Sequence, residues 1–268
     1  MCVPSIKENS PLFKTVIVTL LFPLLFLAGC SIMRGAKTGG IPDASLVINK
    51  YIDATGGRAA HDAVMNRVTK GRFTIEGQAI TGEMTIYVAR PAKMCMVIES
   101  AQFGAIEQGI DKNGIVWEIT PFSEPRIAEE KERVATIRDS RLDKFTAWSE
   151  IYKKTVCAGI DSVGGHSCYR LEAESPDGEI QTFFFDRNSG LLVKTEATIY
   201  HPQGTFLVET YYDDYRTVDG VGVAYSLKII VMDQERILTV KKIQHNVELE
   251  GGLFDLPPEI ETLLREKR

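Results

Sequence analysis

The sequence has no surplus of positive charge. Its 31 Lys and Arg are outnumbered by 36 Asp and Glu, which gives a formal net charge of -5, and no basic run is longer than two residues. Such a chain lacks the cationic surface that binding to a nucleic-acid backbone requires. We therefore expect no nucleic-acid partner.

Motifs for enzymatic chemistry are also missing. The chain has no nucleophile elbow, no phosphate-binding loop and no Cys-x-x-Cys or paired metal-ligand motif, and its four His residues are scattered. Asp213 and Asp214 are adjacent on an expected strand, so their side chains point to opposite faces and do not form an acid–base pair. We expect no enzyme activity, no metal and no cofactor, and a hydrolase is the weakest functional hypothesis.

One long hydrophobic run lies near the N-terminus. Residues 15–28 carry no charge and are too few to cross a bilayer as a helix, which needs ~20 residues. The run ends in Leu27-Ala28-Gly29-Cys30, which resembles the lipobox of bacterial lipoproteins. We expect residues 1–29 to be a lipoprotein signal peptide and Cys30 to be acylated. The alternatives are a plain secretory signal and an N-terminal anchor helix.

Acylation of Cys30 would attach the protein to a membrane. Ser31 follows this cysteine instead of Asp, and the resemblance to bacterial lipoproteins then implies the outer membrane, facing the periplasm. Residues 30–42 are rich in small residues and lack periodicity, as expected of a flexible tether. Residues 43–268 have a length suited to one domain.

That domain begins as a helix and continues as a sheet. Asp43 is a good N-cap for an amphipathic helix that ends at Gly56-Gly57. Beyond the helices, apolar and polar residues alternate, as in strands with one buried face. Turns such as Pro176-Asp177-Gly178 are too brief for the crossovers that parallel strands require. We expect about ten or eleven antiparallel strands, a number at which sheets tend to curl.

A polar, helical insert is expected to interrupt the strands over residues 123–152. Ser123 is its expected N-cap, and Pro125 lies in the first turn. Phe145 and Trp148 mark an apolar face of the insert at helical spacing. These two aromatic residues either pack in the core or line a ligand cavity, and the pattern leaves both interpretations open.

Export to an oxidising compartment would allow disulfides. Cys157 and Cys168 lie on either side of the turn at residues 161–165, and a hairpin in which paired residue numbers sum to about 325 places them opposite each other. We expect a structural disulfide between Cys157 and Cys168, with a reactive thiol pair as the alternative. Cys95 is expected to be a buried free thiol.

Several segments of the domain carry a family resemblance. They are Thr55-Gly56-Gly57, residues 82–88 before Pro91, residues 185–193, residues 214–221, and Asn246-Val247 followed by Phe254 and Pro257. Together with the lipobox they resemble the LolA/LolB-like lipoprotein-carrier superfamily, in particular its outer-membrane lipoprotein-sorting-like members, over residues 43–257. Ala224 departs from the Pro usual in such relatives. The resemblance implies a curled, incompletely closed antiparallel β-barrel with a helical lid and a hydrophobic cavity, mainly β with helices.

The functional hypothesis follows from that resemblance. It is a lipid-anchored, periplasm-facing protein that binds acyl chains of lipoproteins or lipids in a hydrophobic cavity, for their sorting or transfer to the outer membrane. The expected cavity residues are Met84, Ile86, Val88, Met94, Met96, Ile98, Trp117, Phe145 and Trp148. Methionines suit such a cavity because their side chains adapt to flexible chains. The alternative is a non-enzymatic assembly or interaction lipoprotein with a filled barrel, whose exposed strand edges engage a partner.

Overall fold

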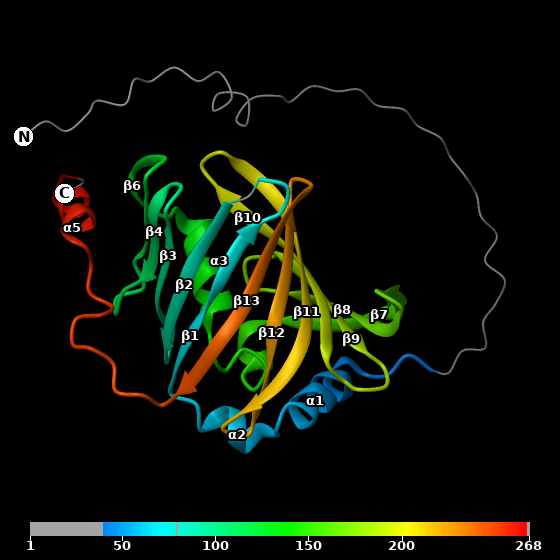
Figure 1. The fold of residues 1–268 in the computed structure, drawn as a ribbon. Helices are drawn as coiled ribbons and strands as arrows, with labels where there is room; N and C mark the ends of the chain where they lie inside the picture. The colour runs from blue at the N-terminus through cyan, green and yellow to red at the C-terminus, as the bar shows by residue number, and fades with distance from the viewer. Residues whose placement is uncertain (1–39, 79, 267–268) are drawn as a thin grey trace, which may run out of the picture. The chain divides into compact units, whose positions relative to one another are not determined.

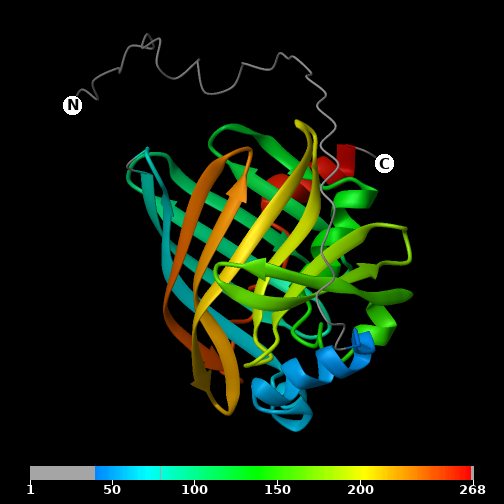
Figure 2. The same cartoon turned by 90° about the vertical axis from the view of Figure 1, so that its right-hand side faces the viewer.

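In the computed structural model, which describes residues 40–78 and 80–266, thirteen strands form one antiparallel sheet that curls without closing into a barrel (Figures 1 and 2). The strands are β1 (Asn66–Ile75), β2 (Ile80–Ala89), β3 (Lys93–Ser100), β4 (Gly104–Ile110), β5 (Val116–Thr120), β6 (Ser123–Ile127), β7 (Lys154–Val163), β8 (His166–Glu174), β9 (Ile180–Asp186), β10 (Leu192–His201), β11 (Gly204–Val218), β12 (Val221–Val231) and β13 (Gln234–His245). The predicted fold class is confirmed. The predicted signal peptide at 1–29 and the acylated Cys30 lie outside the described residues.

The order of strands across the sheet follows the chain with one exception. It runs β6-β5-β4-β3-β2-β1-β13-β12-β11-β10-β9-β8-β7. Short hairpins explain most of this order, because neighbouring antiparallel strands are joined directly. The exception is the pairing of β1 with β13, which brings together the first and last strands of the sheet. The two edge strands, β6 and β7, are therefore consecutive in sequence.

In the described part of the chain, five helices accompany the sheet. They are α1 (Ala44–Ala54), α2 (Arg58–Asp62), α3 (Glu130–Ser140), α4 (Trp148–Ile151) and α5 (Pro258–Glu266). Helix α1 starts at the predicted N-cap, where Oδ1 of Asp43 accepts a hydrogen bond from the backbone N–H of Ser45 at 2.8 Å. Figure 1 shows α1 and α2 at one end of the curled sheet and α3 within its curve, while α5 lies beside β6.

The segment between β5 and α3 differs from the prediction. Ser123 does not cap a helix, because residues 123–127 form the edge strand β6, and α3 begins only at Glu130. Pro125 is compatible with this strand since an edge strand can tolerate a missing N–H donor. With β6 included, the described residues form thirteen strands, more than the ten or eleven expected.

The β7–β8 hairpin corrects the predicted cysteine pair. Cys157 lies opposite Leu171 and Cys168 lies opposite Asp161, because the hairpin register differs from the predicted one and shifts between Cys157 and Gly159. Cys157 packs against the large core cluster that contains Leu171, whereas Cys168 belongs to a separate cluster. Both are free thiols, as is the buried Cys95. Burial raises the pKa of Cys168 to about 11, which disfavours the reactive thiolate.

Candidate functional site

The concave side of the sheet carries an apolar strip made by β2 and β3. Met84, Ile86 and Val88 lie directly opposite Ile98, Met96 and Met94, so the six side chains share one face. We call these six residues the inner strip. Met84 and Ile98 are buried, with 3% and 8% exposure, while the other four are only half-buried. The sequence prediction that these six residues come together is therefore consistent with the strand register.

The opposite face of the same strands carries an exposed, charged cluster around Glu83, while Ala89 and Cys95 farther along this face are buried. Glu83 on β2 accepts hydrogen bonds from Arg72 at 3.1 Å and from Lys241 at 2.6 Å. The face that bears this ion cluster is the convex, outer face, because its side chains are about half exposed. The inner strip therefore faces the interior of the curl.

Trp117 does not join the inner strip, contrary to the prediction. Val116 pairs with Ile110, which pairs with Met94, so Val116 faces the interior and Trp117 faces outward. The Trp117 ring covers Gly109, where an added Cβ would come within 2.4 Å of the ring. The C-terminal segment passes over this outer face, since Lys93 lies 5.2 Å from the ring centre of Phe254.

Phe145 and Trp148 belong to a different cluster, at the α1 end of the interior. Their rings stack at 5.6 Å, and Trp148 meets Phe183 edge-on at 4.8 Å. The rings of Tyr51 and Phe185 complete the packing on the other side of Phe145. Trp148 is only 7% exposed. The structure thus places these two predicted cavity residues together in the aromatic core and apart from the inner strip.

Helix α3 spans the concave side between two regions of the sheet. It contacts β3 and β5 on one side and β10 on the other. On the first side, both Nη atoms of Arg126 donate to the carboxylate of Glu132 at 2.7 Å, and its Nε donates to Glu118 at 3.1 Å. On the second side, the ammonium of Lys131 lies 5.1 Å from the ring centre of Tyr200. Side chains therefore fasten α3 across the opening.

A polar network lies beyond the C-terminal end of α3. Lys144 donates to Asp139 at 2.7 Å, and Gln181 donates to the same carboxylate at 3.1 Å. Burial is the largest single influence and raises the pKa of Asp139, but the charges of Lys144 and Arg138 and the hydrogen bonds from Lys144 and Gln181 together lower it below the usual value. The Asp139 side chain nevertheless keeps 40% exposure.

Arg67 on β1 faces the same interior as the inner strip. Its Cα lies opposite Val88 and His245, and its Nε donates to Nε2 of His245 at 3.0 Å. Nδ1 of His245 is 3.4 Å from Asp219. Within residues 40–78 and 80–266, no carboxylate forms an ion pair with Arg67, and burial lowers the pKa of its guanidinium.

Two further side chains surround this arginine. Burial raises the pKa of the Tyr51 hydroxyl, and the nearby charge of Arg67 opposes that shift. Burial, followed by the charge of Arg67, lowers the pKa of His61. Nε2 of His61 is 2.8 Å from the Thr55 hydroxyl, which itself donates to the carbonyl of Tyr51. His61 is therefore neutral at pH 7, with its proton on Nε2.

Sequence analysis missed Arg67 and Arg236, which also lies on the inner face, opposite Ile75 and Ile229. The signal was present, because continuing the alternation of Phe73 back along β1 leads to Arg67 on the same face. A charged residue at an apolar-face position is the unusual feature that would have identified it.

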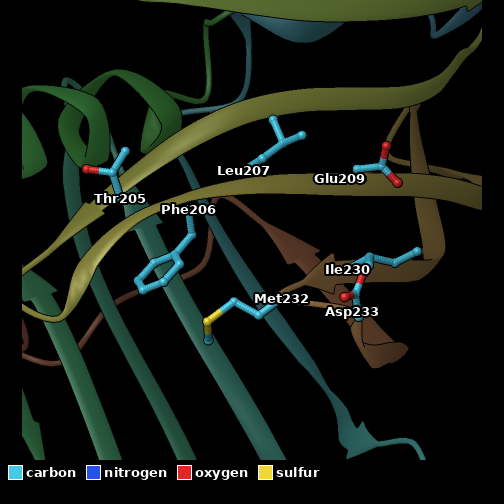
Figure 3. Close-up of a pocket in the computed structure, with 7 residues that line it drawn as sticks. All are labelled: Thr205, Phe206, Leu207, Glu209, Ile230, Met232 and Asp233. Atoms are coloured by element: carbon cyan, nitrogen blue, oxygen red, sulfur yellow. The ribbon is translucent and has the colours of Figure 1, made fainter. Parts of the chain in front are cut away.

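Two hollows of about 470 and 530 Å³ lie at the hairpin ends of the sheet. Figure 3 shows the first, in which Phe206 and Leu207 extend from opposite sides of β11. Its lining residues are Thr205, Phe206, Leu207, Glu209, Ile230, Met232 and Asp233, and the second hollow shares Asp233. Neither hollow is lined by any of the nine predicted cavity residues.

Comparison with solved structures places this architecture among known folds. A LolA superfamily protein from Nitrosomonas europaea matches with a TM-score of 0.54 at 12% sequence identity, over 80% of this chain and 98% of that one. The chain has the LolA-like fold. A DUF1329 family protein from Desulfovibrio piger gives a TM-score of 0.55 at 13% identity, over 80% and 97% of the two chains.

A third structure with the LolA-like fold is a domain assigned to outer-membrane lipoprotein sorting, from Vibrio parahaemolyticus. It matches with a TM-score of 0.50 at 10% identity, over 82% of this chain and 97% of that one. No protein-family model matches the sequence, and neither does any curated protein. At these identities the likeness concerns the LolA-like fold alone.

Two further properties concern the part of the chain that the structure describes. None of its helices combines the length and hydrophobicity needed to cross a bilayer. No group of three or more His, Cys, Asp and Glu side chains in this part is arranged to hold a metal ion.

Proposed function

We propose that this protein is a membrane-tethered binding protein for acyl chains of lipids or lipoproteins, facing the periplasm at the bacterial outer membrane. The inner strip is the observation that carries the proposal. It offers contiguous apolar surface on the concave face, and four of its six residues are only half-buried. Burying each methylene of an acyl chain on such a surface is favourable by ~0.8 kcal/mol.

The LolA-like fold supports the proposal by placing this strip under a helix. Helix α3 spans the concave side and is fastened by ion pairs, so it shields a bound chain from water. Met94 and Met96 add flexible, polarisable side chains that adapt to chains of different shape. The protein acts by binding and release, without catalysis or a cofactor, and a role in lipoprotein sorting is one form of this activity.

A photolabelling experiment tests the proposal. The full chain is kept soluble in amphipol and labelled with a photoactivatable palmitic acid, and the labelled peptides are identified by mass spectrometry. We expect labels on β2 and β3. Ile86→Trp fills the space above the inner strip and should abolish this labelling, whereas Thr85→Trp points outward from the same strand and should leave it unchanged. Equal labelling of both variants, or labels confined to other strands, would contradict the proposal.

A second candidate function is an assembly lipoprotein that binds a protein partner. The observation in its favour is the edge strand β7, which exposes Val156 and Ile160 by 40% and 42%. An exposed apolar edge can accept a strand from another chain. The aromatic cluster of Phe145 and Trp148 also fills part of the interior, as this function would require. The photolabelling experiment distinguishes the two, because an assembly protein would not label at the inner strip.

A further inference from the structure

Arg67 is a half-buried cation that faces the interior, and no carboxylate in residues 40–78 and 80–266 is its partner. Its hydrogen bond to His245 uses only Nε, and its two Nη groups make no hydrogen bond to any residue in the described ranges 40–78 and 80–266. An unpaired charge in a protein interior is unfavourable unless water or an anion compensates it. The Arg67 guanidinium therefore presents free donors to the interior space.

The orientation of Arg67 is fixed by the residues behind it. Nε2 of His245 accepts the hydrogen bond from Nε of Arg67, so His245 is neutral and carries its proton on Nδ1. Nδ1 of His245 lies 3.4 Å from the Asp219 carboxylate without forming a hydrogen bond to it. The contact with His245 holds the guanidinium by its Nε edge. The two Nη groups then face away from this contact, as a bidentate anion site requires.

The carboxylates of Asp219 and Asp62 contact other residues and not Arg67. Asp219 faces His245 and is 67% exposed, and Asp62, which acts on His61, lies 3.9 Å from Arg90. The groups whose pKa the charge of Arg67 affects are the side chains of Tyr51, His61 and His245. Since no carboxylate in residues 40–78 and 80–266 forms an ion pair with Arg67, its guanidinium can accept an anion.

The inner strip begins directly beside this arginine. Val88 is the Cα partner of Arg67, and the apolar face continues from Val88 through Ile86 to Met84. Along β1 the same face extends from Arg67 to Ile75, about 26 Å at ~3.3 Å per residue. An acyl chain in one leaflet of a bilayer spans about 15 Å, half of the ~30 Å hydrocarbon core. The face is long enough for such a chain with its head group at Arg67.

We propose that Arg67 binds the anionic head group, a carboxylate or a phosphate, of an amphiphile whose apolar chain lies along the inner strip. This inference rests on the proposed acyl-chain binding and names the ligand class. Neutral amphiphiles of the same chain length bind the strip but lack the charge-assisted hydrogen bonds to the guanidinium. The site therefore prefers anionic lipids and fatty acids to fatty alcohols.

Head-group preference is measured with two photoactivatable probes of equal chain length, palmitic acid and hexadecanol. The full chain in amphipol is titrated with each probe, and the half-maximal labelling concentration on β2 and β3 is determined. We expect the acid to label at a concentration at least about ten-fold lower than the alcohol, the effect of one charge-assisted interaction. Arg67→Met should remove this preference by raising the half-maximal labelling concentration of the acid. The half-maximal labelling concentration of the alcohol should change by no more than about two-fold.

Two arginines serve as matched controls. Arg72→Met removes an exposed cation from the outer face of the same strand, and Arg236→Met removes an inner-face cation from the far end of the strip. Both should retain the preference for the acid. Lysophosphatidylglycerol should compete with the acid probe if a phosphate head is accepted, whereas inorganic phosphate alone should not compete.

The outcomes separate this inference from the proposed function. Equal labelling by acid and alcohol in the unaltered protein, or a preference that survives in Arg67→Met, overturns the head-group site while acyl-chain binding stands. Labelling by neither probe overturns the proposed function. If inorganic phosphate competes as strongly as lysophosphatidylglycerol, the claim that the ligand is an amphiphile is overturned. If Arg67→Met does not fold, Arg67→Lys decides, because it keeps the charge and should retain part of the preference.

Discussion

Replacing Trp148 by Ala tests whether the aromatic cluster beside α1 is structural core or lining that a ligand can displace. Trp148 is 7% exposed, its ring lies 4.5 Å from that of Tyr152 and 4.8 Å from that of Phe183, and its indole N–H donates to Thr155 at 2.8 Å. Truncating a buried Trp to Ala typically costs about 3–5 kcal/mol. Because Trp148→Ala loses both the ring contacts and the hydrogen bond, we expect it to lower the free energy of unfolding by about 4 kcal/mol.

The measurements are urea and thermal unfolding followed by far-UV circular dichroism, with Trp117, the other of the two tryptophans, as a fluorescent probe. At roughly 2–4 °C per kcal/mol for a chain of this size, Trp148→Ala should lower the Tm by about 8–16 °C. Trp148→Phe keeps an aromatic ring and loses the N–H donor, so it should cost only about 1–2 kcal/mol. A loss below about 1 kcal/mol for Trp148→Ala, together with altered labelling by palmitic acid, would refute the assignment to core packing.

Two further predictions concern the joint between β1 and β13 and the histidines beside Arg67. Gly71→Ala should lower the free energy of unfolding by about 2–3 kcal/mol, because a Cβ there would lie 2.5 Å from the backbone oxygen of Thr239. The control Gly251→Ala, which has open space around it, should leave thermal unfolding unchanged. Equal Tm values for the two variants would contradict the argument. Burial, and then Arg67, lowers the pKa of both His61 and His245. Below their unfolded pKa of ~6.5 the unfolded chain binds protons that the folded chain does not, so stability should fall with decreasing pH by up to about 1.4 kcal/mol per pH unit for each histidine. Unfolding free energies between pH 7.5 and 5.5 should show a smaller slope in His245→Gln than in the unaltered protein; an unchanged slope would exclude this origin.

The architecture and most of the inner strip could be predicted from local pattern. On β2 and β3 the inner face is apolar, and the charged residues Glu83, Lys93 and Glu99 all lie on the other face, so period-two alternation identifies the inner residues without knowledge of the fold. The N-cap at Asp43 is equally local, since its side chain bonds a backbone group two residues away. Fold class follows from the many short turns.

Trp117 shows why alternation failed on β5. Both faces of this strand are covered, as Val116 is 1% exposed and Trp117 4% exposed. The C-terminal segment, nearly 140 residues further along the chain, passes over the outer face, so apolar residues occur on both sides. When both faces are buried, hydrophobicity no longer tells which residue points inward.

Register and long-range partners set the remaining limits. The Cys157–Cys168 prediction depended on a hairpin register that the shift between Cys157 and Gly159 alters, and a change of one residue moves a side chain to the other face. The surroundings of Arg67 come from α1, α2 and β13, which no local pattern connects. Its role could be inferred only once these elements were seen together.

The pairing of β1 with β13 has a consequence for assembly of the chain. Strands β1–β6 and β7–β13 are each a meander of sequence neighbours, and within residues 40–78 and 80–266 the only ladder between these two halves joins the first strand to the last. During synthesis from the N-terminus, the first meander is complete while β1 still presents an unsatisfied backbone edge in what becomes the middle of the sheet. Premature truncation anywhere before residue 234 would leave that edge permanently open, at the position where a stray strand from another molecule could replace the missing one.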